Sequence, residues 1–201
     1  MKPTYNGFEA KANKGAYLDV PPVGAYVAEI QDVRFVPADG NKQQRDAIEL
    51  MIEITEGEYK NRYHDLYKDQ DEKWGNAKYR GTFSLYPPTE NDEDWRKRVF
   101  EGNLWCVEQS NNGYKWDWDE KKLKGKAVGI NIRKKLYTYT KRKDNTEETV
   151  EAETTEIAKF ETVDDVKNGK CRMLKERDTR HYATSEQNFT PVDSTSVSVP
   201  W

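Results

Sequence analysis

Cysteine and histidine are scarce in this sequence, which has 201 residues but only two of each. Cys106 and Cys171 lie far apart and match no metal-binding or redox spacing. His64 and His181 belong to no recognisable catalytic motif with a serine or a cysteine. Thiols without such a pattern are typical of a reducing cytoplasm, where disulfides are rare. We therefore expect a cytoplasmic protein that is not an enzyme and needs no metal or cofactor.

Long apolar segments are also missing. Residues Met1 to Ala16 contain no signal-peptide core, and no stretch approaches the roughly 20 apolar residues of a membrane helix. There is no glycine-rich phosphate-binding loop, and the acids between Asp65 and Glu72 lack the glycine and the terminal glutamate of a calcium loop. The sequence therefore predicts a soluble protein without a membrane partner.

The charges are unevenly distributed along the chain. The net charge is only −3, although charged residues make up 34% of the sequence. From Lys121 to Lys143 there are ten lysines or arginines and no acid, whereas Asp144 to Asp165 holds nine acids and one lysine. Aromatic residues reach 12%. Because local fields decide what a surface attracts, the basic stretch indicates a polyanionic partner.

Alternation of apolar and polar residues predicts strands at 24–36, 48–54, 79–86, 127–139 and 149–160, with 62–67 as a further aromatic-rich strand segment. The apolar side of the first strand changes after Ile30, which predicts a bulge or a strong bend. A helix is expected between the third and fourth strands, with Thr89 as its N-cap and Trp95 on its buried stripe.

This order of elements predicts a mainly β fold, a five-stranded OB-fold-like Greek-key barrel with a helix between strands 3 and 4. Residues 1–20 are expected to form an N-terminal arm, 21–169 the barrel domain, and 170–201 a C-terminal extension with a flexible tail. OB-folds bind oligonucleotides over strands 2 and 3 and over the loops that join strands 1–2 and 4–5. The sequence leaves homo-oligomerisation open.

The outward face of the fourth strand carries the best candidate binding site. Period-2 spacing puts two cations and two tyrosines on one surface. Cations follow phosphates and aromatic rings stack on bases, and single-strand binding requires both. Further cations fall in the loop expected after that strand, and further candidates surround the third strand. The candidate nucleic-acid-binding residues are Arg133, Lys135, Tyr137, Tyr139, Lys141, Arg142, Lys143, Arg80, Tyr86 and Trp74. An ordinary solvated strand face is the alternative.

Other features of the sequence oppose this interpretation or leave it open. Glu49 and Glu53, on the predicted outer face of the second strand, would repel phosphate. The acidic stretch fits either an edge strand protected by charge or an internal mimic of nucleic acid. Trp116 and Trp118 alternate with acids and fit either core packing or a sugar-binding platform.

Four short segments resemble a family of phage and prophage proteins, the DUF669-like proteins. They are Pro22-Val23-Gly24-Ala25-Tyr26, Glu56-Gly57-Glu58-Tyr59-Lys60-Asn61-Arg62, Leu123-Lys124-Gly125-Lys126-Ala127-Val128-Gly129 and Phe160-Glu161-Thr162-Val163-Asp164-Asp165-Val166-Lys167-Asn168-Gly169. The resemblance implies an OB-fold that binds single-stranded DNA in the host cytoplasm, within a phage replication or recombination module. The matching residues are glycines and strand ends, so they imply a fold and no particular binding residue.

The sequence thus predicts a single-stranded DNA-binding protein with little base preference. Two other classes stay open: a carbohydrate-binding or host-surface β domain, and a phage protein that inhibits a host enzyme. The tail that ends at Trp201 could recruit replication or recombination proteins, by adding a strand to a partner's sheet, or could be frayed. It has only Glu186 and Asp193 as acids, unlike the acidic tips of bacterial single-strand binders.

Overall fold

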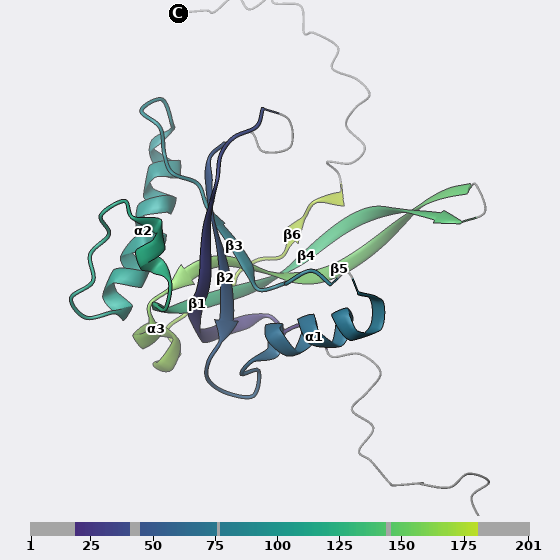
Figure 1. Ribbon diagram of the computed structural model, residues 1–201, viewed down its shortest axis with the longest axis horizontal. Coiled ribbons are helices and arrows are strands. Elements are labelled where there is room, and N and C mark those ends of the chain that lie inside the picture. Colours follow the sequence, from purple (N-terminus) through teal and green to yellow (C-terminus); the bar gives the residue numbers. More distant parts are fainter. Residues whose placement is uncertain (1–18, 41–44, 76, 144–145, 181–201) are drawn as a thin grey trace, which may run out of the picture. The chain divides into compact units, whose positions relative to one another are not determined.

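A computed structural model describes residues 19–40, 45–75, 77–143 and 146–180 of this chain (Figure 1). The elements in chain order are β1 (Gly24–Val36), β2 (Ala47–Ile54), α1 (Arg62–Trp74), β3 (Thr82–Leu85), α2 (Asp94–Ser110), the 3-10 turn η1 (Glu120–Leu123), β4 (Ala127–Lys143), β5 (Thr146–Glu161), α3 (Val163–Lys167) and β6 (Arg177–Asp178). The protein is mainly β, as the sequence predicts. Most of the predicted N-terminal arm and the predicted tail from residue 181 lie outside the described residues.

The chain divides into two units, Met1–Arg133 with Thr155–Leu174, and Lys134–Thr154 with Lys175–Trp201. We call the described residues of the first the core unit and those of the second the ribbon unit. Strands β4 and β5 run through both units, so each unit takes one half of each strand. No helix among the described residues has the length and apolar character needed to span a bilayer.

Six strands form one sheet in the hydrogen-bonded order β3-β2-β1-β4-β5, and β6 pairs with β4. The register between β1 and β2 shifts between Ile30 and Asp32. This confirms the bulge expected from the change of apolar side. In the second strand Ile48, Leu50, Ile52 and Ile54 are all buried, as their period-2 spacing predicts.

The sheet is open in the described residues, because β3 and β5 end the hydrogen-bonded path and do not pair. The ring of Phe83 on β3 nevertheless packs against that of Phe160 on β5, with 4.6 Å between centroids. The two outermost strands of the core unit therefore meet through side chains. A closed five-stranded barrel is not confirmed.

Helix α1 replaces the strand predicted at residues 62–67. Its Tyr63 and Leu66, three residues apart, are buried on one face, which is helical spacing. The buried carboxylate of Glu53 on β2 accepts hydrogen bonds from the backbone N–H groups of Tyr63 and His64, at 3.1 and 2.7 Å. The strand prediction was wrong because a short aromatic run fits either period, and a charge distant in sequence fixed the helix start.

The helix between the third and fourth strands is confirmed as α2, but its expected details differ. It begins at Asp94 after Glu93, whereas Thr89 forms a turn with Asp92. Trp95 is 51% exposed and not part of the core. The buried face is instead made by Phe100, Asn103, Leu104, Cys106 and Val107.

Helix α3 packs on the face of β4 opposite the main core. A Cβ atom on Gly129 would lie 2.6 Å from Val166 on α3, so only glycine allows this approach. Asn131, on the same side of β4, is buried and donates to Glu161 and to the carbonyl of Arg172 at 2.8 and 3.0 Å. The first half of β4 is therefore covered on both faces, as expected for a central strand.

Candidate nucleic-acid interface

The ribbon unit consists of the second half of β4, the first half of β5, and β6. β6 lies parallel to β4, pairing Lys135 with Arg177 and Leu136 with Asp178. None of the described residues of this unit falls in the buried class. Its side chains therefore form two surfaces that face away from each other, and alternation decides which residues share a surface.

One ion pair shows which side chains of β4 and β5 lie on the same side of the ribbon unit. Lys134 contacts Glu153 at 2.6 Å, which places both on the same side of the ribbon. Alternation then places Glu147 and Glu151 on that side as well. From residue 149 on, the exposure of β5 follows the same period, because residues 149, 151 and 153 are exposed while 150, 152 and 154 are half-buried. Most acids of β5 in this unit therefore lie on the Lys134 side, which we call the acidic face.

The acidic face is largely neutralised by contacts within the unit. Arg180 binds Asp178 at 2.6 Å and Glu151 at 2.8 Å. Hydrogen bonds to these two carboxylates raise the pKa of Arg180. The hydrogen bond to Glu153 likewise raises the pKa of Lys134. These charges satisfy one another, as expected for a folded, solvated strand surface.

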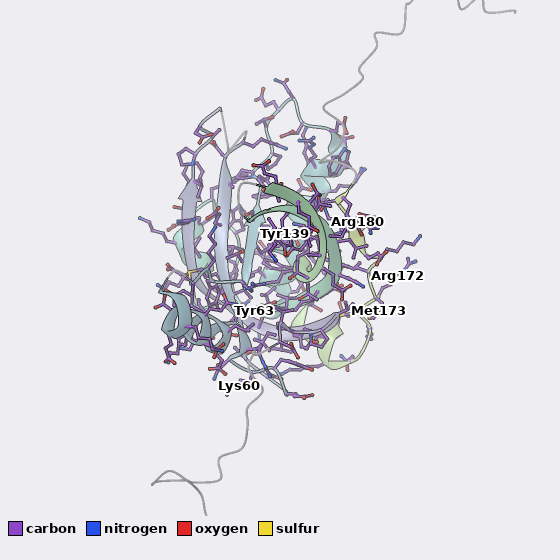
Figure 2. The ribbon with its side chains drawn as sticks, turned by 90° about the vertical axis from the view of Figure 1, so that its right-hand side faces the viewer. Lys60, Tyr63, Tyr139, Arg172, Met173 and Arg180 are labelled. Carbon is purple, nitrogen blue, oxygen red and sulfur yellow. The ribbon has the colours of Figure 1, made fainter. Side chains whose placement is uncertain are left out.

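The opposite side, which we call the basic face, carries the residues predicted from the sequence. By alternation along β4 and by pairing with β6, it holds Lys135, Tyr137, Tyr139, Lys141 and Arg177. The rings of Tyr137 and Tyr139 are 6.2 Å apart, and Tyr139 is 45% exposed. Tyr139 is labelled in Figure 2. The β5 residues on this face are Glu148, Val150, Ala152 and Thr154. Two tyrosine rings thus lie among cations, and Glu148 is the one acid that β5 places on this face in the ribbon unit.

Three further predicted residues, Arg133, Arg142 and Lys143, belong to the basic stretch of the sequence. Arg133 lies in the core unit, half-buried, with its guanidinium on Glu156 at 2.8 Å. The expected loop at 141–143 is wrong, because β4 continues to Lys143 and β5 begins at Thr146. The side chains of Arg142 and Lys143 lie outside what the structure describes.

The predicted residues around the third strand lie in the core unit. Arg80 and Tyr86 are exposed, on either side of the short strand β3. Between them, Leu85 is buried and Phe83 packs on the core. Trp74 is the last residue of α1, and its side chain lies outside the described parts.

An open cleft of about 350 Å³ lies on the outer side of β1, β2 and the segment before β3. Its two cations, Arg34 and Lys78, are not among the candidate binding residues predicted from the sequence. Its lining includes Arg34, Met51, Lys78, Tyr79 and Thr82. Predicting it required knowing which strands are neighbours, because residues 34, 51 and 78 come from three separate segments.

Glu49 and Glu53 on β2, which were expected to repel phosphate, both have partners within the core unit. Glu53 is 5% exposed, and besides the start of α1 it accepts from the hydroxyl of Tyr79 at 2.9 Å. The prediction that it lies on an acidic outer face was therefore wrong. Glu49 pairs with Arg34 at 2.5 Å. Neither carboxylate presents an uncompensated charge to the cleft.

The segment between α3 and β6 carries cations that are not among the binding residues predicted from the sequence. Lys170, Arg172, Lys175 and Arg177 are all exposed, and Met173 is 66% exposed. Arg172 and Met173 are labelled in Figure 2. A signal was present in the sequence, since Lys167 to Arg177 contains five cations and one acid, Glu176. The stretch has no strand-like alternation, so only the pairing of Arg177 with β4 relates it to the tyrosines.

The tryptophans of the sugar-binding alternative lie after α2. Trp118 is 65% exposed, stacks on Phe100 at 5.9 Å, and has a left-handed backbone conformation with φ of 68°. Trp116 is half-buried and packs on the core. The neighbouring Asp117 is paired with Lys122, whose hydrogen bond lowers the pKa of the aspartate. Only one of the two tryptophan rings is therefore exposed, and it lies beside an ion pair. This arrangement gives the sugar-binding alternative little stacking surface.

Comparison of the chain with models of protein families and with curated proteins gives no match in either case. The resemblance to the DUF669-like proteins therefore stays a prediction. Within the described residues, no group of three or more histidine, cysteine, aspartate or glutamate side chains is placed to hold a metal ion.

Proposed function

We propose that this protein binds single-stranded DNA through the basic face of its ribbon unit, without catalysing a reaction. The separation of charge between the two faces is the observation that carries the proposal. Acids follow the basic stretch directly in sequence, yet three of the four acids of β5 in the ribbon unit lie on the side of Lys134 and Arg180. The tyrosines consequently share their surface with Lys135, Lys141 and Arg177.

In this mechanism the cations follow the phosphates while bases stack on Tyr139 and Tyr137. Stacking contributes about 1–3 kcal/mol per base and tolerates any base, because every base has a π-face. Binding should therefore show little sequence preference and a strong dependence on salt. Duplex DNA, whose bases are already stacked, should bind more weakly.

An OB-fold identity is part of the same proposal. The strand order with α2 between β3 and β4, the bulge in β1 and the contact between Phe83 and Phe160 support a strongly curved sheet related to that barrel. The cleft beside β2 is then a second surface for the nucleic acid, with Lys78 and Arg34 as its cations. Action within a phage replication or recombination module in the cytoplasm, as the resemblance implies, completes the proposal.

The decisive experiment measures binding of labelled oligo-dT at two or more salt concentrations, with duplex DNA as the comparison ligand. The double variant Lys141→Gln with Arg177→Gln removes two exposed cations from the basic face. If both contact phosphates, the slope of log K against log salt should fall by about 1.4, at roughly 0.7 for each lost contact with a single strand.

The matched control is Lys115→Gln with Lys121→Gln, which changes the net charge equally but affects exposed cations of the core unit. This control should leave the slope almost unchanged. Equal losses in the two variants would mean that only net charge matters and would reject the basic face as the site. Salt-independent binding of an oligosaccharide, with no binding of oligo-dT, would favour the sugar-binding alternative.

A further inference from the structure

Helix α2 exposes an apolar stripe that the proposed DNA site does not use. Trp95, Val99, Gly102 and Trp105 are spaced by four, three and three residues, so they follow one side of the helix. Trp95, Val99 and Trp105 are 51, 55 and 52% exposed. The face of α2 centred on Phe100, Leu104 and Val107 is already buried in the core unit. Large exposed apolar side chains in such an arrangement mark an interaction surface.

Gly102 at the middle of this stripe has no role within the core unit. A Cβ atom added there would meet no atom within 4 Å, so the chain itself does not require glycine. Glycine inside a helix is destabilising relative to alanine. A glycine at this position does, however, allow another helix backbone to approach closely. The occupant of the surface is thus expected to bring a helix across Gly102.

The stripe is also complementary to itself. Val99 lies three residues before Gly102 and Trp105 lies three residues after it. When two copies of α2 cross antiparallel at Gly102, each Val99 faces the Trp105 of the other copy, as a two-fold axis requires. Tryptophan is among the residues most enriched at the centres of protein interfaces.

The charges on α2 favour the antiparallel arrangement. The first half of the helix carries Arg96, Lys97 and Arg98, whereas the last turn contains no cation. Antiparallel crossing places the basic half of each copy beside the C-terminal end of the other, where the helix dipole is negative. A parallel arrangement would bring the basic halves together.

From these observations we infer that α2 is the interface of a homodimer, formed by two copies of the stripe Trp95-Val99-Gly102-Trp105 about a two-fold axis at Gly102. The contacts at the crossing point are apolar, so the affinity of the dimer should depend on salt much less than DNA binding does. This sets it apart from DNA binding on the basic face, and either proposal can fail while the other holds.

Sedimentation equilibrium of the full chain without DNA tests the inference. The wild type should dimerise reversibly, and Trp105→Glu should weaken the dimer at least tenfold by burying a charge at the centre. Gly102→Gln should do the same without harming the fold, since its side chain extends into open space and suits a helix better than glycine. Thermal unfolding of the variants confirms that they are folded.

Met173→Glu is the matched control, because Met173 is an apolar residue of the core unit, 66% exposed, that is not on α2. It should leave the dimer unchanged. A wild type that stays monomeric at every accessible concentration would overturn the inference. So would a dimer that Trp105→Glu and Gly102→Gln leave intact, or one that Met173→Glu weakens equally.

Discussion

The core unit and the ribbon unit share two strands but differ in how deeply the side chains of those strands are buried. In the core unit β4 carries Val128, Ile130 and Ile132, none of which has any exposed surface. In the ribbon unit the same strand carries Lys135, Tyr137 and Tyr139, and no described residue is fully buried. One strand therefore belongs to a hydrophobic core over its first half and to a solvated ribbon over its second.

This difference shows which positions can carry binding residues without disturbing the packing of the protein. Core positions are constrained by close packing, so a change of even one methylene group is felt there. Ribbon positions are constrained mainly by strand geometry and by ion pairs such as that of Lys134 with Glu153. Cations and rings can accumulate on one ribbon face at little cost in stability, and that face is the proposed DNA site.

The largest expected effect on stability tests the core side of this contrast. Ile130→Ala should lower the free energy of unfolding by about 2–5 kcal/mol, because it leaves a cavity in a fully buried site. In the ribbon, Thr140→Ala should change it by no more than about 0.5 kcal/mol, as for most exposed positions. Urea denaturation measures both. Similar losses in the two variants would mean that the ribbon is as tightly packed as the core.

The buried carboxylate of Glu53 should come next. Glu53→Ala leaves the N–H groups of Tyr63 and His64 without their acceptor, and we expect a loss of roughly 3 kcal/mol together with reduced helix content from α1. Glu49→Ala, four residues earlier on β2, breaks an exposed ion pair and should cost no more than about 0.5 kcal/mol. Urea denaturation followed by circular dichroism separates them. Equal costs would contradict the structural role of Glu53.

A smaller effect on stability, but a clear one on binding, is expected from the ribbon tyrosines. Tyr139→Ala should weaken oligo-dT binding by about 1–3 kcal/mol while leaving the urea midpoint nearly unchanged. Tyr139→Phe keeps the ring and should retain most of the affinity. Fluorescence anisotropy titration measures both. A greater loss from Tyr86→Ala would move the main stacking site into the core unit.

The smallest expected effect concerns thiol reactivity in the core unit. Burial raises the pKa of the Cys106 thiol to about 11. At pH 8 roughly one Cys106 in a thousand should then be thiolate, the reactive form, so alkylation should be very slow and should speed up as the pH rises toward that pKa. Mass spectrometry after iodoacetamide treatment should show the half-exposed Cys171 modified first. Rapid labelling of Cys106 in the folded protein would show that the core opens readily.

Much of the sheet could be predicted from the sequence, because period-2 alternation is a local property. It identified the core residues of β2 and the bulge of β1, and it put the tyrosines of β4 on one face. The sequence also predicted a strand at residues 62–67, which begin α1, and a buried Trp95, which is exposed. A short run of aromatic residues fits both periods, and the partners that decide the outcome, such as Glu53, are distant in sequence.

The sequence by itself determined the main strands of the sheet and which of their residues share a face, since backbone geometry alternates side chains without help from the rest of the chain. Only the tertiary structure decided that β5 turns most of its acids away from Tyr137 and Tyr139, that Arg177 joins them through β6, and that Glu53 is buried. Those outcomes depend on strand pairing and register, and pairing brings together residues that no local pattern relates.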